Sequence, residues 1–149
     1  MRELAAEVGI KAASICHHFP SKADLAAAIA ERYWQDTNAW LNEVTREEGD
    51  PKASLRKYPQ TFRTSLENGN RLCLGSFLGA EYDDLPEQVR QQVQTFADVN
   101  IAWLAERLVD AGLTDEEGSE VRASSTFAAV AGEQLSARSR GLTSRSSTQ

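Results

Sequence analysis

The chain has 149 residues, enough for a helical body with a small module attached. Hydrophobic residues make up 41% and charged residues 26%, which is typical of a folded globular protein and excludes a disordered one. No apolar run approaches the roughly 18 residues that span a membrane, and the first residues lack the basic-then-apolar order of a signal peptide. We therefore expect a cytoplasmic protein without a membrane partner.

The net charge of −6 is unevenly distributed along the chain. Residues 1–22 hold three basic and two acidic residues, whereas the remainder holds thirteen basic and twenty acidic residues. The acidic remainder would repel a polyphosphate, so nucleic acid is tolerated only at the N-terminal end.

Two short helices are predicted at the N-terminus. The first runs from about Arg2 to Val8 and ends at Gly9, the residue type that most readily adopts a left-handed backbone. The second runs from about Lys11 to His18 and is ended by Pro20.

A long helix is predicted from about Lys22 to Glu48. Ser21 and Asp24 have the spacing of a capping box at its start, and Gly49-Asp50-Pro51 ends it. Its apolar stripe is formed by Leu25, Ile29, Tyr33, Trp40 and Val44.

The rest of the chain predicts further helices and no strands. Residues 52–66 contain Pro59, which indicates a kink or a late start. Residues 72–82 are strongly apolar and are expected to be buried nearly all round. A long helix follows from the Pro86-Glu87 start signal to about Ala111, and a last one from about Thr114 to Arg138. The fold class is therefore all-α, and residues 139–149 are assigned no structure.

The first two helices have the pattern of a helix-turn-helix. This motif needs a small residue where the helices cross, and Ala5 supplies it. It also needs a glycine four positions later and a β-branched residue on the second helix, which are Gly9 and Ile15. An ordinary helical hairpin can share this triad. The buried side is expected to comprise Leu4, Val8 and Ile10.

In a helix-turn-helix the second helix enters the major groove. Its first residues, Lys11, Ala12, Ala13 and Ser14, would face base edges, and Lys22 would meet a phosphate.

The segment LAAEVGIKAASICHHFPSKADL resembles the signature of TetR-family repressors, I-A-x-x-A-G-V-S-x-x-x-x-Y-x-H-F-x-x-K-x-x-L. Further on, NGNRLCLGSFLGAEYDDLPEQVRQQV resembles the C-terminal domain of one subgroup of that family. The resemblance implies a homodimer on palindromic double-stranded operator DNA, with recognition helices about 34–36 Å apart. It also implies release by a small apolar effector bound in each body. The matching residues are Leu4-Ala5, Gly9-Ile10, Ser14, His18-Phe19, Lys22 and Leu25.

The chain departs from this family in three places. Met1 falls at the start of the family's second helix, so the first helix is expected to be missing. Cys16 replaces a tyrosine that usually donates to a phosphate, and a thiol is a poor donor that His17 would only partly replace. Cys16, His17 and His18 are all among the residues expected to contact DNA. The family's last helix is also missing, so we expect a chain truncated at both ends.

Neither a metal site nor a catalytic site is expected. Cys16 and Cys73 lie far apart and are read as reduced thiols. The neighbouring Cys16, His17 and His18 would point about 100° apart on a helix, which does not suit a metal. The chain has no nucleophile elbow and no glycine-rich phosphate loop, so we predict no enzyme activity and no cofactor.

The effector pocket is predicted from aromatic residues and one amide in the body, which could equally be core residues. Asn100 is the outlier, because a polar residue on an apolar stripe needs a partner. The predicted pocket residues are Phe62, Phe77, Phe96, Asn100 and Trp103.

We expect a partial helix-turn-helix domain with its connecting helix at 1–45, an effector-binding and dimerisation domain at 46–138, and a flexible tail at 139–149. The predicted function is a ligand-responsive transcriptional repressor. The alternative is a helical ligand-binding or scaffold protein that has lost DNA binding through truncation.

Overall fold

The computed structural model describes residues 1–141, which are almost entirely helical and contain no strand. The predicted all-α class is confirmed. The elements are α1 (Arg2–Val8), α2 (Ala12–His18), α3 (Lys22–Glu48), α4 (Pro51–Lys57), α5 (Gln60–Glu67), α6 (Leu74–Ala80), the 3-10 turn η1 (Tyr82–Asp84), α7 (Glu87–Asp110) and α8 (Glu116–Arg140).

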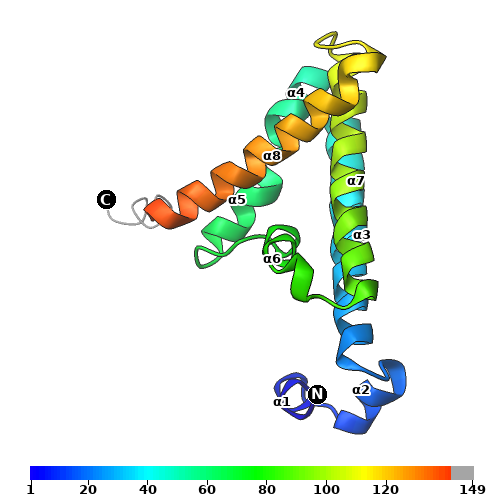
Figure 1. Cartoon of the computed structure of the whole chain (residues 1–149). Coiled ribbons are helices and arrows are strands. Elements are labelled where there is room, and N and C mark those ends of the chain that lie inside the picture. Colours follow the sequence, from blue (N-terminus) through cyan, green and yellow to red (C-terminus); the bar gives the residue numbers. More distant parts are fainter. Residues whose placement is uncertain (142–149) are drawn as a thin grey trace.

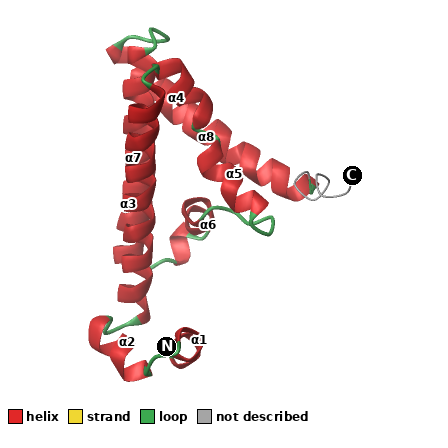
Figure 2. Cartoon of the chain, turned by 180° about the vertical axis from the view of Figure 1, so that it is seen from behind, coloured by secondary structure: helices red, strands yellow, loops and turns green. Residues whose placement is uncertain are grey.

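The long helices α3 and α7 pack side by side and form a column (Figure 1). At one end of this column α8 turns away at an angle, with α4 and α5 beside it, and α6 lies inside the angle (Figure 2). The short helices α1 and α2 lie at the opposite end, where α3 begins. The helices α1 and α2 are thus separated from the end of the column where α4 and α8 meet it by most of the length of α3.

The start of α3 is fixed by its predicted capping box. The Ser21 hydroxyl oxygen accepts from the Asp24 backbone N–H at 3.1 Å, and the Asp24 carboxylate accepts from the Ser21 backbone N–H at 3.0 Å. Both bonds satisfy donors that the first turn of a helix leaves free. The helix bounds agree with the sequence-based expectation of 22–48.

Pro59 divides the predicted segment 52–66 into two helices. A proline lacks the N–H that a continuous helix needs, and α4 ends before it at Lys57 while α5 begins after it at Gln60. Tyr58, between them, is almost completely buried and anchors the bend in the core.

The core of the body lies where α3, α4, α5, α7 and α8 meet. Its buried residues are Leu41, Val44, Tyr58, Phe62, Cys73, Trp103, Leu104, Leu108 and Ala123.

The expectation for residues 72–82 was wrong. This segment is not buried nearly all round, because α6 packs on α3 and α7 by one side, where Cys73 and Gly75 are buried. The opposite side faces outward, and the Phe77 side chain is 52% exposed there.

The predicted stripe on α3 was also partly wrong, since Ile29 is half exposed. The neighbouring Ala30 is buried in its place, followed by Thr37, Leu41 and Val44.

The last helix runs two residues beyond its expected end, to Arg140, so the first part of the predicted tail is helical. The remaining tail residues, 142–149, lie outside the described residues. Within residues 1–141, no helix combines the length and the apolar character that crossing a membrane requires.

Candidate nucleic-acid interface and effector cavity

The helices α1 and α2 form the predicted helix-turn-helix. Ala5 of α1 is 2% exposed and Ile15 of α2 is 6% exposed, and these are the buried residues of the two helices. Gly9, between the helices, has φ 72°, and its left-handed conformation ends α1. The small residue, the glycine and the β-branched residue therefore occupy the positions that the motif requires.

The expected buried side of this module was wrong. Leu4, Val8 and Ile10 are 41%, 61% and 48% exposed, because no described helix lies over that side of α1 and its turn. Within the module, α1 and α2 contact each other, with Ala5 and Ile15 buried.

The side chains predicted to contact DNA lie on the free surface of this module. Ile15 is the one buried residue of α2, so the other faces of this helix are open to a partner. Lys11 is the N-cap of α2, and its side chain is exposed. Lys11, Ala13, Ser14, Cys16, His17, His18 and Lys22 are exposed, and Ala12 is half-buried.

His17 and His18 contact one another edge to face, with ring centroids 5.3 Å apart. Cys16 is an exposed free thiol beside them. In residues 1–141, His, Cys, Asp and Glu side chains do not gather in threes in a way suited to a metal ion.

Two side-chain bonds join α3 to α7 near the helix-turn-helix. The Gln88 amide donates to Asp24 Oδ1 at 3.0 Å, and Asp24 is also part of the capping box. The Trp34 indole N–H donates to Gln92 Oε1 at 2.8 Å. The N-terminal half of α7 is therefore tied to the part of α3 that follows the helix-turn-helix.

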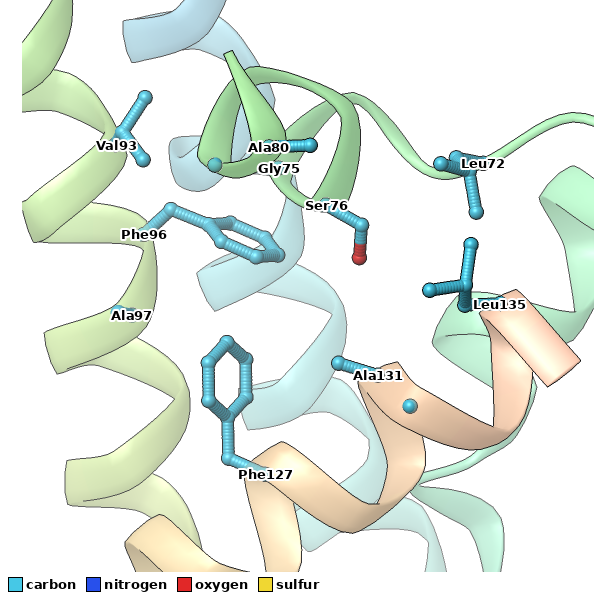
Figure 3. Close-up of a pocket in the computed structure, with 12 residues that line it drawn as sticks. Leu72, Gly75, Ser76, Ala80, Val93, Phe96, Ala97, Phe127, Ala131 and Leu135 are labelled. Atoms are coloured by element: carbon cyan, nitrogen blue, oxygen red, sulfur yellow. The ribbon is translucent and has the colours of Figure 1, made fainter. Parts of the chain in front are cut away.

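A cavity of about 360 Å³ lies between α6, α7 and α8 (Figure 3). Phe96 of α7 and Phe127 of α8 point into it, with ring centroids 6.2 Å apart. Phe96 also contacts Tyr33 of α3 at 5.5 Å between ring centroids. The full lining is Leu72, Gly75, Ser76, Gly79, Ala80, Val93, Phe96, Ala97, Phe127, Ala131, Gly132 and Leu135.

A second, more polar groove of about 690 Å³ lies between the α4–α5 segment and α8. Phe62, Leu66 and Val130 are among its apolar residues. Its charged residues are Arg56, Arg63, Glu67 and Glu133.

The comparisons agree with this geometry. Residues 1–29 match the family model described as bacterial regulatory proteins, tetR family. A solved transcriptional regulator of the TetR family from Agrobacterium tumefaciens is 30% identical, with a TM-score of 0.80, over 91% of this chain and 74% of that chain. The chain belongs to the TetR family of transcriptional regulators.

Two further solved structures resemble this TetR-family regulator. A TetR transcriptional regulator from Legionella pneumophila is 29% identical with a TM-score of 0.86, over 94% of this chain and 76% of that chain. The reduced form of E. coli NemR is 25% identical with a TM-score of 0.80, over 93% of this chain and 75% of that chain. A search of curated proteins found no match.

The predicted pocket residues of this TetR-family regulator do not lie in one cavity. Phe96 lines the cavity between α6, α7 and α8, whereas Phe62 lines the second groove. Phe77 is exposed and lines neither. Trp103 is a core residue whose indole N–H donates to Thr45 Oγ1 at 2.9 Å.

The buried Asn100 side chain has hydrogen-bond partners for both its amide nitrogen and its amide oxygen. Its side chain is fully buried, its amide donates to the Phe96 carbonyl oxygen at 2.7 Å, and its Oδ1 accepts from the Tyr58 hydroxyl at 2.9 Å. Burial raises the pKa of Tyr58, so this hydroxyl stays protonated and donates. The amide is therefore satisfied within the core of the TetR-family body.

Sequence reasoning missed most of the cavity lining. Ser76, Phe127 and Leu135 line the cavity but were not among the predicted pocket residues. It also missed Gln88 and Gln92, because a surface glutamine gives no sequence signal of a partner about 60 residues away.

Proposed function

We propose that the protein is a ligand-responsive repressor in the cytoplasm. As a homodimer it binds palindromic operator DNA through α2, and a small molecule bound in the body releases it. Residues 1–45 act as the DNA reader with its connecting helix, and residues 46–138 act as the effector-binding and dimerisation part.

The observation that carries this proposal is the exposed reader helix. Apart from Ile15, the residues of α2 are exposed or half-buried, and the helix lies at the free end of the α3–α7 column (Figure 1). A major groove admits one helix of this kind, with its first residues at the base edges. The basic side chains for phosphate contact are Lys11 and Lys22.

An exposed seam on α8 supports the homodimer. Six exposed positions follow one another at alternating spacings of three and four residues, the pattern by which two helices pair along a stripe. Small residues in its middle allow a close approach between helices. The seam comprises Val121, Ser125, Ala128, Gly132, Leu135 and Ser139, of which Gly132 and Leu135 also line the cavity between α6, α7 and α8.

Contacts between the cavity and α3 support ligand release. Phe96, in the cavity wall, packs on Tyr33 of α3, and α7 is bonded to α3 through Gln88 and Gln92. A ligand that binds better when α7 is displaced would move α3 and hence α2. Such differential binding is the thermodynamic requirement for release.

The proposal is tested by fluorescence anisotropy with a duplex from the region upstream of the gene. We expect affinity that falls steeply as salt rises, because Lys contacts release counterions from phosphates. Lys11→Ala and Lys22→Ala should each weaken binding about tenfold and make the salt dependence shallower.

Lys52→Ala is the matched control, since Lys52 is an exposed lysine on α4 at the other end of the column. It should leave the affinity unchanged. If all three variants bind alike, or if the chain binds no duplex, the reader role fails and the alternative of a helical ligand-binding or scaffold protein gains support.

A further inference from the structure

The hydroxyl of Ser76 is an unusual feature of the cavity between α6, α7 and α8. Its oxygen accepts from the Cys73 thiol at 3.1 Å, which leaves the O–H of Ser76 outside this bond. Figure 3 shows the side chain pointing into the space between Phe96, Phe127 and Ala131. A hydroxyl keeps a donor as well as acceptor lone pairs, so this one has a proton to offer to an occupant.

The rest of the lining selects against charge. None of the twelve residues around the cavity is charged, and eleven of them carry no polar side-chain atom. The cavity is half open to solvent, so an ion placed there would lose part of its hydration and find no counter-charge in the lining, which is unfavourable. A neutral molecule would bury apolar surface against this lining and gain affinity.

The shape of the lining favours a ring system. Phe96 and Phe127 are inclined at 62° to each other, so each can contact a planar ligand face to face or edge on. Gly75 carries no side chain, and the Phe96 ring lies directly against its backbone. The volume of about 360 Å³ lies near the lower end of the ~300–1,000 Å³ range of ligand pockets, which favours one or two fused rings.

We propose that this cavity binds a small, uncharged aromatic molecule that presents one hydrogen-bond acceptor, a carbonyl oxygen, to Ser76. The role of this molecule as the releasing effector rests on the proposed function, whereas its binding does not.

The test uses three naphthalene probes that differ in one substituent. The probes are 1-acetonaphthone with a carbonyl, 1-ethylnaphthalene without an acceptor, and the 1-naphthoate anion. Isothermal titration calorimetry measures each against the full chain without DNA. We expect the ketone to bind about 2- to 12-fold more tightly than the hydrocarbon, the range for one net hydrogen bond. The anion should bind at least tenfold more weakly than the ketone.

Variants locate the binding site. Ser76→Ala should abolish the preference for the ketone over the hydrocarbon without abolishing binding. Ala131→Leu should weaken all binding at least tenfold, because the Ala131 side chain points into the cavity. Gly79→Leu is a second filling variant, since a Cβ at Gly79 meets no atom within 4 Å and the fold can accept it. Ala39→Leu, at an exposed position of α3, adds the same volume elsewhere and should bind like the parent chain.

Each result decides the proposal. A ketone preference that disappears in Ser76→Ala, together with weaker binding in either folded filling variant, supports it. Failure of all three probes to bind, anion binding as tight as ketone binding, or unchanged binding in both filling variants overturns it. If the ketone binds as expected but does not lower DNA affinity, the site stands and the proposed release mechanism fails.

Discussion

At the scale of single residues, two glycines one turn apart on α6 have different physical roles. A Cβ on Gly75 would lie 2.3 Å from the Phe96 ring, so the absence of a side chain lets α6 and α7 pack closely. A Cβ on Gly79 would meet no atom within 4 Å. From the sequence, a glycine at either position could weaken the helix or allow a neighbouring helix to come close. Gly75 allows the close approach of α7, whereas Gly79 only weakens the helix.

Alanine substitution separates these roles. Gly75→Ala should lower the free energy of unfolding by about 1–3 kcal/mol, because the methyl group overpacks against Phe96. Gly79→Ala should raise it by about 0.5–1 kcal/mol, because alanine favours the helix more than glycine does. Urea denaturation followed by circular dichroism measures both. Equal effects of the two substitutions would contradict the close packing at Gly75.

A second pair of residues shows how a polar group is accommodated in the core. Asn100→Leu should lower the free energy of unfolding by about 1–3 kcal/mol, because it leaves the Tyr58 hydroxyl buried without its acceptor. Tyr58→Phe should cost less when Asn100 is already leucine than in the parent chain. A double-mutant cycle by urea denaturation measures this coupling. Additive effects would show that the bond contributes nothing to stability.

At the scale of elements, helix ends are set by local chemistry. The start of α3 depends on Ser21 and Asp24, and Gly49 ends the same helix with φ 62°. Pro59 separates α4 from α5 by removing one backbone donor. Each signal acts within one helical turn, which is why the bounds of α3 follow from the sequence.

Removal of the helix cap at Ser21 should affect both the stability of the protein and its DNA binding. Ser21→Ala should cost about 0.5–2 kcal/mol of stability, because the Asp24 N–H loses its acceptor. Fraying of the first turn of α3 should also weaken DNA binding, since this turn carries Lys22 next to the reader helix. Thermal unfolding and anisotropy measure the two effects. Ser21→Asp supplies another good N-cap residue and should restore most of the stability.

At the scale of the whole molecule, the charge and the exposed apolar surface are arranged along one long column. The helix-turn-helix lies at one end and the acidic body extends from the other. The six seam positions on α8 are exposed. This arrangement allows two copies to pair through their bodies while presenting two reader helices to one face of DNA.

A charge placed in the seam tests the pairing. Ala128→Glu should shift the chain from dimer to monomer, because a dimer would bury an unpaired carboxylate on each copy. Sedimentation velocity over a concentration series measures the change. Ala39→Glu on the exposed side of α3 is the matched control and should leave the mass unchanged. Parallel loss of operator affinity in Ala128→Glu alone would tie DNA binding to the dimer.

The sequence by itself determined the all-α class, the helix-turn-helix triad and most helix bounds. These depend on residues within a few positions of one another, such as Ser21 with Asp24 or Ala5 with Gly9. The family resemblance on residues 4–25 likewise needed no tertiary information, and the comparisons confirmed it.

Only the tertiary structure decided which faces are buried and where the cavity lies. Asn100 meets Tyr58 across 42 positions of sequence, and Trp34 meets Gln92 across 58. Phe77 is exposed and Gly75 is buried because of where α7 lies, not because of their neighbours in the chain. Hydrophobic periodicity gives a helix an apolar side, but the contacts that cover that side come from helices that the local pattern does not specify.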